Sequence, residues 1–446
     1  MRPKIIVLDD DPTGSQTVHG CLLVTSWDED VLREALADEA PLFFVLTNTR
    51  SVSAEEAAAV TREVCRNLRQ PLEEHRAPWL IVSRSDSTLR GHYPVETDVI
   101  AEELGPFDAH FLTPEFFEGG RITRDGTHYV VRDGVETPAH ETEFARDSVF
   151  GYSTAYLPAY VEEKTGGRIA AAKVELFDPS EPDGRVLERL RSMSGNACGA
   201  ISAASQAELD RLASLLLQVA GEGRRFLFRS AASLLTSLAD LPPQPVAPEE
   251  MARYVPDGRA GLVLVGSHVP MSTRQLERLI DARGASAPRR GGLVHIELDV
   301  GRLPDSDGSL TGEIASGVRE AHATGVDVLL STSREERTFD TAEERLAFGL
   351  EISRVLMTIV RHAPATLGFI LSKGGITSND VLSTGLGLRT ARVAGQIHPG
   401  CSVVLTPPEH RHGSIPVVIF PGNVGDEESL RLVYDRLTAA VPTRGT

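Results

Sequence analysis

The sequence predicts an α/β protein of two three-layer domains, each with a mainly parallel sheet between two layers of helices. Three observations lead to this prediction. Short apolar runs alternate with segments of helical period along the chain. The chain has 446 residues, 41% of them hydrophobic, which is too long for one ordinary domain and too apolar for a disordered protein. A segment at 241–250, with four prolines in ten residues, interrupts the pattern near the middle.

The first half of the chain carries apolar runs of strand length, which are Lys4–Leu8, Cys21–Thr25, Leu42–Leu46, Trp79–Val82, Ala109–Leu112, Ala197–Ile201 and Phe226–Phe228. Ser53 and Glu56 have capping-box spacing before an apolar helical face, so a helix is expected from Ser53 to Leu68. From Arg121 to Pro182 the pattern loosens, with short β-like pieces such as His128–Arg132. We expect a lobe there that could close over a ligand.

The proline-rich segment marks the predicted domain boundary, because proline removes N–H donors and fixes φ. We expect a first domain at 1–240, a linker at 241–258 and a second domain at 259–446. The second domain repeats the alternation, with strands expected at Leu262–Val265, Leu293–Leu298, Val326–Leu330, Phe369–Leu371, Val403–Leu405 and Val417–Phe420. Ser272 and Gln275 have the spacing of a capping box at the start of one of its helices.

The charge balance restricts the partners of the protein. The sequence has 45 Lys and Arg residues against 63 Asp and Glu, a formal net charge of −18. A surface of that sign repels phosphate polymers, so nonspecific binding to nucleic acid or to anionic membranes is not expected. No stretch approaches the roughly 18 apolar residues of a membrane helix, and the N-terminus lacks the apolar core of a signal peptide. We expect a cytoplasmic protein that meets small anions with local cations or backbone N–H groups.

The four cysteines, Cys21, Cys65, Cys198 and Cys401, lie far apart and form no C-x-x-C pair. This spacing disfavours a zinc site and a disulfide framework, and it favours reduced, buried thiols. The sequence identifies no set of metal-ligating residues.

Two polar loops follow strands of the first domain, where parallel sheets bind ligands. The loop Asp9–Ser15 opens with three carboxylates, whose repulsion must be offset by hydroxyl ligands, a metal ion or cations. The loop Ser83–His92 holds hydroxyls, one carboxylate and two guanidiniums, and arginine matches a carboxylate bidentately. The alternatives are an acidic turn that caps a helix and an ordinary hydrogen-bonded loop. The functional interpretation is a site that binds a polyhydroxylated ligand or holds a catalytic base.

Three turns of small residues follow strands of the second domain, at Gly266–His268, Lys373–Ser378 and Pro421–Asp426. Glycine lets the backbone approach a phosphate, and a helix N-terminus offers N–H groups and a favourable dipole to anions. Lys373 adds a positive charge at the second turn. The P-loop and dinucleotide fingerprints are absent, and one Gly-rich turn alone is also typical of an ordinary connection. The joint occurrence of three such turns predicts a phosphate-binding edge.

At these loops the chain resembles the four-carbon acid sugar kinase family over essentially its whole length. The matching residues are, in chain order, Asp10, Asp11, Thr13 and Gly14 of A-D-D-x-T-G; Asp86–Gly91 of D-S-T-L-R-G; Pro114, Gly120, Arg121, Thr123, Gly126 and Tyr129; Gly266, Ser267, Thr273 and Gln275; Lys373–Ser378; Gly395–Ile397 with Pro399–Gly400; and Phe420–Gly425. Asp9 stands in the alanine place of the first motif. Ile376 stands where many members carry an aspartate.

The resemblance implies an N-terminal acid-sugar-binding domain, a C-terminal ATP-binding domain and an active site in the interdomain cleft. It implies phosphoryl transfer from ATP, with Mg²⁺, to a terminal hydroxyl of a four-carbon or similarly short sugar acid or 3-oxo acid, such as a tetronate. The residues expected at the site are, for the acid, Asp10, Asp11, Thr13, Arg84, Ser87, Arg90 and Arg121, and, for ATP, Gly266, Ser267, Lys373, Gly374, Gly375, Thr377, Gly422, Asn423 and Gly425.

The general base is expected among Asp10, Asp11 and Asp86, with Asp86 slightly favoured. Two other functions stay open. A sugar-acid dehydrogenase would need a dinucleotide fingerprint, which is not visible, and a noncatalytic regulator would bind an acid sugar and a nucleotide. The identity of the acid, the formation of a homo-oligomer and the role of residues 127–173 also stay open.

Overall fold

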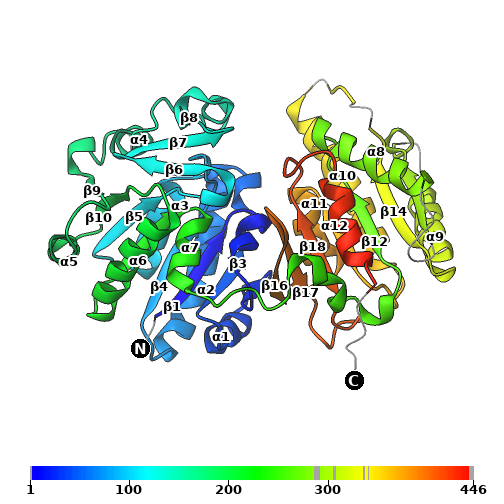
Figure 1. The fold of residues 1–446 in the computed structure, drawn as a ribbon, viewed down its shortest axis with the longest axis horizontal. Coiled ribbons are helices and arrows are strands. Elements are labelled where there is room, and N and C mark those ends of the chain that lie inside the picture. Colours follow the sequence, from blue (N-terminus) through cyan, green and yellow to red (C-terminus); the bar gives the residue numbers. More distant parts are fainter. Residues whose placement is uncertain (1–2, 286–291, 305–307, 335–336, 340, 441–446) are drawn as a thin grey trace. The chain divides into compact units, whose positions relative to one another are not determined.

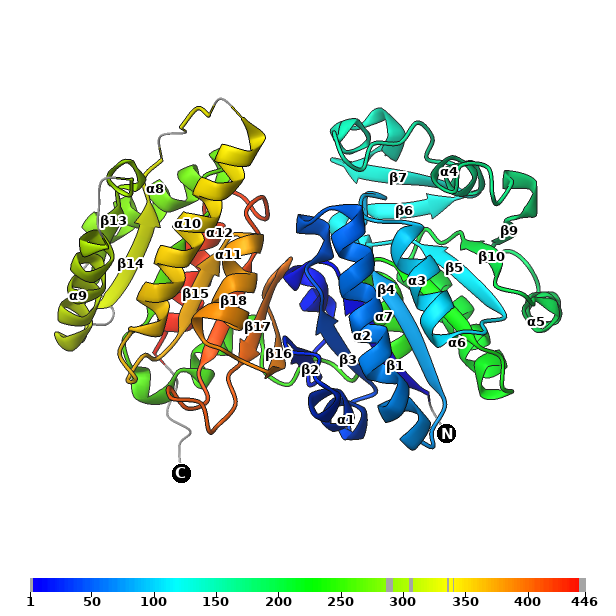
Figure 2. The same ribbon diagram turned by 180° about the vertical axis from the view of Figure 1, so that it is seen from behind.

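The computed structural model describes residues 3–285, 292–304, 308–334, 337–339 and 341–440. The chain divides into two compact units, Met1–Pro242 and Pro243–Thr446. In each unit helices cover both faces of a sheet (Figure 1), and the opposite view shows the helices of the second face (Figure 2). The predicted α/β class with three layers in each unit is confirmed.

The main sheet of the first unit is parallel, with strands in the order β2-β3-β1-β4-β11-β5-β10-β9. Its strands are β1 (Lys4–Asp9), β2 (Leu22–Val24), β3 (Leu42–Leu46), β4 (Trp79–Arg84), β5 (Ala109–Thr113), β9 (Glu175–Phe177), β10 (Ala197–Ile201) and β11 (Phe226–Ser230). The strands β1, β4 and β11 run past their predicted ends, to the polar residues Asp9, Arg84 and Ser230. The extended strands therefore carry polar side chains to the carboxyl edge of the sheet.

The helices of the first unit form two layers. They are α1 (Glu29–Ala37), α2 (Ala54–Glu74), α3 (Val95–Leu104), α4 (Leu157–Lys164), α5 (Asp183–Ser192), α6 (Gln206–Gly221) and α7 (Ala232–Ala239). Helices α1, α2 and α3 pack on one face of the sheet and share a core with β1, β3 and β4, while α6 and α7 cover the other face (Figure 1). The predicted capping box is confirmed, since Ser53 and Glu56 exchange side-chain and backbone hydrogen bonds at the start of α2.

A lobe on the first unit spans residues 121–164. It contains a small antiparallel sheet of β6 (Arg121–Arg124), β7 (Thr127–Arg132) and β8 (Val135–Pro138), then the 3₁₀ helix Glu143–Arg146 and α4. The lobe is anchored to the loop after β4. His128 Nε2 lies 2.7 Å from the carbonyl oxygen of Ser87, and the Tyr152 hydroxyl donates to the carbonyl of Thr88 over 2.8 Å. The loosely patterned segment is thus an ordered cover on the polar loop Ser83–His92.

The sheet of the second unit has a parallel part, β13-β14-β12-β15-β18, continued by the antiparallel strands β17 and β16. Its strands are β12 (Leu262–Val265), β13 (Leu293–Leu298), β14 (Asp327–Thr332), β15 (Ile370–Lys373), β16 (Thr390–His398), β17 (Cys401–Leu405) and β18 (Pro416–Phe420). Strand β16 was not predicted, because polar residues and Gly395 interrupt its apolar pattern. The predicted mainly parallel character is confirmed.

The helices of the second unit are α8 (Pro270–Ala285), α9 (Ser309–Ala323), α10 (Ala342–Arg361), α11 (Gly375–Asp380) and α12 (Ser429–Thr438). Helices α8 and α12 cover one face, and α10 and α11 cover the other (Figure 2). The capping box predicted at Ser272 is wrong. Helix α8 begins at Pro270, whose fixed φ suits the first helical position. The Ser272 hydroxyl instead donates to the carbonyl of Gly422, and its oxygen lies 3.0 Å from the Ser267 hydroxyl oxygen.

The segment expected as a linker, 241–258, is only partly irregular. A 3₁₀ helix spans Pro248–Tyr254, and its Met251 packs, together with Val255, into the core of the second unit. The proline-dense residues 241–247 before it contain no helix or strand.

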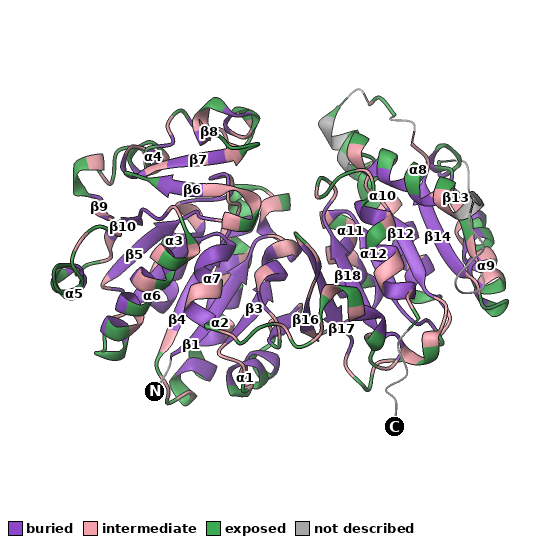
Figure 3. Cartoon of the chain, in the orientation of Figure 1, coloured by how far each residue is buried: buried purple, intermediate pink, exposed green. Residues whose placement is uncertain are grey.

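Burial follows the layers, with most strands buried, except β8 and much of β13, and the outer helix faces exposed (Figure 3). Cys21, Cys65, Cys198 and Cys401 are all buried, as predicted, and none forms a disulfide in the structure. Among the helices of the described ranges, none has the length and hydropathy needed to cross a membrane.

Candidate active site

The carboxyl edge of the first sheet brings the two predicted polar loops together. Strands β1 and β4 are neighbours, and Asp9 and Arg84, their last residues, are partners in the register. The loops that follow them, Asp9–Ser15 and Ser83–His92, therefore begin side by side. Ser85 donates to Asp10 Oδ2 over 2.5 Å, which joins the two loops directly.

Arg50 is the cation that offsets the carboxylates. It follows β3, and its guanidinium pairs with Asp10, with Asp11 at 3.3 Å and with Asp86 at 4.0 Å. Burial opposes its charge, but the three carboxylates outweigh burial and hold the pKa of Arg50 well above its ordinary value. The sequence indicated that hydroxyl ligands, a metal ion or cations must offset these carboxylates, but it did not identify Arg50, although the residue follows an expected strand.

Asp86 is ionised and fixed by cations. Arg90 Nε donates to it over 2.9 Å, and the Thr88 hydroxyl also donates to it. Burial would raise its pKa, but Arg50 and Arg90 outweigh burial and bring the pKa of Asp86 well below its ordinary value. Asp86 also lines a hollow of about 20 Å³. That volume suits about one water molecule, so any larger molecule bound here would extend beyond the hollow.

Asp9 differs from the other carboxylates of its loop. It is fully buried, Oδ1 lies 3.3 Å from Arg84 Nη1, and Oδ2 has no hydrogen-bond partner among the residues that the structure describes. Burial, partly opposed by Arg84, raises the pKa of Asp9 to about 7. A Cβ atom on Gly14 would collide with this carboxylate, so glycine is required there by space.

Arg84 lies deeper than the sequence suggested. Its side chain is 5% exposed and pairs with Asp9, while a second contact of 4.0 Å reaches Asp10. The structure thus places Arg84 beneath the carboxylates. Of the other expected residues, Thr13 donates its backbone N–H to Asp11 over 2.8 Å, and Ser87 uses its carbonyl oxygen to hold the lobe.

Arg90 and Arg121 lie on one aromatic ring. Their guanidinium carbons are 5.1 and 5.8 Å from the centre of the Phe144 ring, and that of Arg132 is 5.5 Å from it. Cation–π attraction holds guanidiniums together that would otherwise repel one another. Phe144 comes from the lobe, so the lobe gathers the arginines that the sequence assigned to an acid. Phe144 itself was not predicted.

Two more residues of the first unit were missed. Arg229, in β11, donates to Ser83 and to Ser85 over 2.7 Å, pairs with Glu96, and lines the same small hollow as Asp86. Glu115, just after β5, is fully buried, and neither carboxyl oxygen has a hydrogen-bond partner in the described residues. Burial raises the pKa of Glu115 to about 8.

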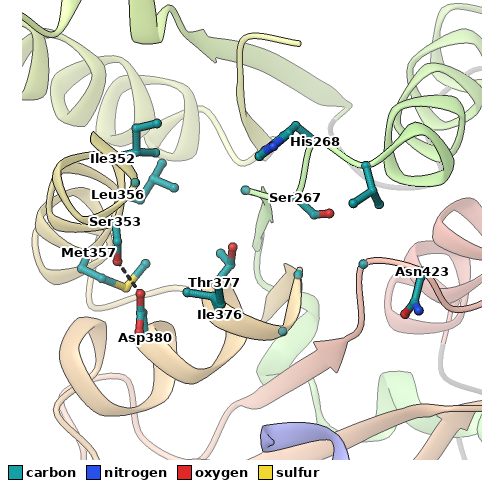
Figure 4. A pocket seen from close by; sticks show the side chains of 16 residues that line it. Ser267, His268, Ile352, Ser353, Leu356, Met357, Ile376, Thr377, Asp380 and Asn423 are labelled. Atoms are coloured by element: carbon teal, nitrogen blue, oxygen red, sulfur yellow. Dashed lines mark hydrogen bonds between the residues drawn. The ribbon is translucent and has the colours of Figure 1, made fainter. Parts of the chain in front are cut away.

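The second unit contains a pocket of about 470 Å³ (Figure 4). Its lining residues are Gly266, Ser267, His268, Val269, Gly349, Ile352, Ser353, Leu356, Met357, Gly374, Gly375, Ile376, Thr377, Asp380, Gly422 and Asn423. The three predicted turns converge here because they follow β12, β15 and β18, which are adjacent strands. The volume is typical of a small-molecule site.

The turns pack closely against one another on one side of this pocket. Ser272 Oγ lies 3.0 Å from Ser267 Oγ and 2.8 Å from the Gly422 carbonyl oxygen. Gly374 has φ of +128°, a conformation that favours glycine, and a Cβ on Gly266 would collide with Thr377. Of the expected nucleotide residues, only Lys373 and Gly425 are outside the lining.

Lys373 holds a turn and does not reach the pocket. Its side chain is fully buried, and the amine donates to the carbonyls of Pro421 and Gly422 over 2.6 and 3.2 Å. The amine also lies 3.8 Å from the centre of the Phe420 ring. Burial lowers the pKa of Lys373 to about 7. The positive charge expected to face a phosphate is therefore buried against the Pro421–Gly422 backbone, outside the pocket lining.

The opposite side of the pocket is apolar and belongs to helices. Ile352, Leu356 and Met357 project from α10, and the Ser353 hydroxyl donates to Asp380 of α11 (Figure 4). No signal in the sequence linked Ser353 to Asp380. Within the part of the chain that the structure describes, no group of three or more His, Cys, Asp or Glu side chains is arranged to hold a metal ion.

Comparison with protein families gives two matches in succession. Residues 5–238 match the family described as sugar-binding N-terminal domain, and residues 262–430 match the family described as nucleotide-binding C-terminal domain. The first match alone covers more than half of the chain.

Two curated relatives are similar in sequence. D-threonate kinase from Bordetella bronchiseptica is 29% identical over 164 residues, which are 35% of this chain and 38% of that protein. D-erythronate kinase from Heliobacterium modesticaldum is 24% identical over 397 residues, 83% of each chain. The chain thus matches well under half the length of the first relative and most of the second. Among solved structures, Haemophilus influenzae protein HI1011 has a similar fold, with a TM-score of 0.64 and 17% identity over 97% of this chain and 100% of that one.

Proposed function

We propose, because the chain belongs to the four-carbon acid sugar kinase family, that it is a sugar-acid kinase that uses ATP. The acceptor is a terminal hydroxyl of a four-carbon or similarly short sugar acid or 3-oxo acid, such as a tetronate. The names of the two kinase relatives support the reaction class. The specific acid and the use of ATP are part of the proposal.

The observation that carries the nucleotide assignment is the two-sided pocket of the second unit. Three small-residue turns meet on one side, where backbone N–H groups can approach phosphates, and apolar side chains stand on the other, where a base can pack. Gly266, Ser267, Gly374, Gly375, Thr377, Gly422 and Asn423 would contact ATP. Lys373 and Gly425 would act through the shape of the turn at Pro421–Gly425.

The charged loops of the first unit would bind the acid. Arg90 and Arg121, held on Phe144, would face its carboxylate. Asp10, Asp11, Thr13 and Ser87 would position its hydroxyls. Arg84 would act indirectly, since it is buried beneath Asp9 and Asp10.

Asp86 would accept the proton of the reacting hydroxyl. The hydroxyl oxygen forms a bond to the γ-phosphorus, the bond from that phosphorus to the bridging oxygen breaks, and ADP leaves with the electron pair. Asp86 is ionised at neutral pH and lines the hollow of the first unit, whereas Asp10 is nearly fully buried and paired with Arg50. Mg²⁺ would neutralise charge on the phosphates; it is typically bound through phosphate oxygens, waters and one or two carboxylates.

The test incubates the protein with ATP, Mg²⁺ and a panel of tetronates, 3-oxo-tetronates and branched analogues, and follows ADP. We expect turnover with at least one acid. Asp86→Asn should lower kcat about 10²- to 10⁴-fold, the usual range for loss of a general base. Asp98→Asn, an exposed carboxylate paired with Arg168, is the matched control and should leave kcat unchanged.

The possible results separate this proposal from its rivals. No ADP above background with any acid would exclude the kinase assignment. Binding of an acid and a nucleotide without turnover would instead favour the noncatalytic regulator. Near-normal kcat in Asp86→Asn would remove Asp86 as the base but leave the kinase assignment in place.

A further inference from the structure

One carboxylate faces the apolar side of the nucleotide pocket. Among its lining residues, which all lie in the described ranges, Asp380 carries the single carboxylate, and none is lysine or arginine. A carboxylate repels phosphate, so a polyphosphate would lie at the opposite side, along the small-residue turns. Asp380 can accept a hydrogen bond from a donor group of whatever fills its side of the pocket.

Asp380 lies where it could contact the edge of a nucleotide base bound in the pocket. Figure 4 shows Asp380 and Ser353 on the side of Leu356 and Met357, with Thr377 between them and Ser267. A nucleotide with its phosphates at Ser267 would therefore extend its base toward Asp380. Apolar side chains of α10 would pack on the faces of the base.

Asp380 is held in one orientation by its neighbours. The Ser353 hydroxyl donates to Oδ2, and Asn379 Nδ2 donates to Oδ1 over 3.1 Å. Each carboxylate oxygen has a second lone pair, so the group can still accept a hydrogen bond from the pocket. The residue is only partly buried, which leaves that position accessible.

We infer that Asp380 accepts a hydrogen bond from the 6-amino group of adenine and so selects ATP over nucleotides with a 6-oxo purine. The inference rests on the proposed function, because it takes the pocket as the nucleotide site. A 6-oxo group would place an acceptor against the carboxylate, and the Ser353 hydroxyl is already donated to Asp380. Guanine would leave its 6-oxo group beside apolar residues without a side-chain donor.

The test measures kcat/KM and nucleotide affinity with ATP, ITP and GTP in the wild type and three variants. Affinity is read by displacement of a fluorescent ATP analogue, so it does not depend on turnover. The wild type should prefer ATP to ITP by about tenfold or more, the usual value of one hydrogen bond to a charged partner. Asp380→Asn should reduce that ratio to within about threefold, because an amide N–H can donate to a 6-oxo group.

Two further variants control for structure. Glu351→Gln makes the same change of carboxylate to amide on an adjacent helix, outside the pocket lining, and should keep the full ATP preference. Ser353→Ala removes the donor that orients Asp380 and should weaken the preference partly. Thermal unfolding of each variant excludes misfolding as the cause of a change.

The outcomes distinguish this inference from the kinase proposal. An unchanged ratio in a folded Asp380→Asn, or a wild type that prefers GTP, overturns the inference while turnover still supports the kinase. A clear ATP preference in binding without turnover supports the inference and counts against the kinase. Absence of nucleotide binding overturns both.

Discussion

The two candidate binding regions solve the problem of holding an anionic ligand in opposite ways. In the first unit, Arg50 pairs with Asp10, Asp11 and Asp86, and the remaining hollow is about 20 Å³. In the second unit, the pocket is about 470 Å³, and its lining contains no lysine or arginine. One region is organised by paired charges, and the other by backbone turns. The difference suggests two ways in which a chain of net charge −18 would accommodate the anions of the proposed function.

The two designs carry different costs. Buried charges must be balanced within the protein, so the loss of one partner leaves the others uncompensated. Backbone N–H groups at a glycine turn need no balancing charge, but they tolerate no additional atoms. Mutations should therefore damage the stability of the first unit and the ligand affinity of the second.

The largest expected effect comes from removing the central cation of the first unit. Arg50→Met leaves three carboxylates without their shared partner, and we expect a loss of about 3 kcal/mol of unfolding free energy together with loss of turnover. Urea unfolding measures the first quantity. The control is Arg33→Met, which breaks an exposed pair with Glu74 and should cost less than about 1 kcal/mol. Equal losses for the two variants would mean that the buried cluster does not depend on Arg50.

The next effect concerns the turns of the second unit. Gly266→Ala places a Cβ against Thr377, so the turn must shift, and we expect KM for ATP to rise about tenfold, equivalent to about 1.4 kcal/mol. KM for the acid and the unfolding temperature should change little. Gly312→Ala, in α9 with open space around the new methyl group, is the matched control. A lower acid affinity in Gly266→Ala with normal ATP affinity would reverse the assignment of the two regions.

The smallest expected effect is a pH dependence of stability that arises from Glu115 in the first unit. Glu115 is a buried carboxyl without a cation, and its pKa is raised to about 8, whereas Asp86 has cations and a lowered pKa. The folded protein holds the Glu115 proton in a pH range where the unfolded chain has released it. The stabilisation is thus complete below about pH 4.5 and is lost as the pH rises through about 8.

Glu115→Gln should remove this dependence. We expect the variant to match the wild type near pH 4.5, to become the more stable of the two as the pH rises, and to unfold a few degrees higher at pH 9, as measured by thermal unfolding across the pH range. Glu118→Gln, an exposed neighbour, should follow the wild-type curve. Parallel curves for Glu115→Gln and the wild type would show that Glu115 is not protonated in the folded protein.

Much of the fold could be predicted because the strands of a parallel sheet are short, continuous apolar runs. Leu42–Leu46 and Leu262–Val265 have the predicted bounds, and the capping box at Ser53 is present. Strand β16 escaped prediction because its apolar pattern is interrupted by polar residues and by Gly395. The capping box at Ser272 was predicted wrongly. The spacing of Ser272 and Gln275 is that of a capping box, but the helix already begins two residues earlier, at Pro270.

The candidate site was predictable where its residues lie close together in the sequence. The loops at Asp9 and Ser83 and the three glycine turns were found in this way. Arg50, Arg229 and Asp380 were missed because their partners are distant along the chain and only the packed sheet brings them together. Lys373 was predicted to lie beside a phosphate because of its charge and its place before the glycine turn. In the structure its side chain is buried, and its amine donates to backbone carbonyl groups.

The reactivity of the four buried thiols would report local unfolding of each unit. Three of them, Cys21, Cys65 and Cys198, belong to the first unit, and Cys401 belongs to the second. Burial raises the pKa of Cys198 to about 12, and it raises those of Cys65 and Cys401 as well, so thiolate forms readily only after local unfolding. The positions that react with an alkylating reagent thus report which unit has opened, without any introduced label.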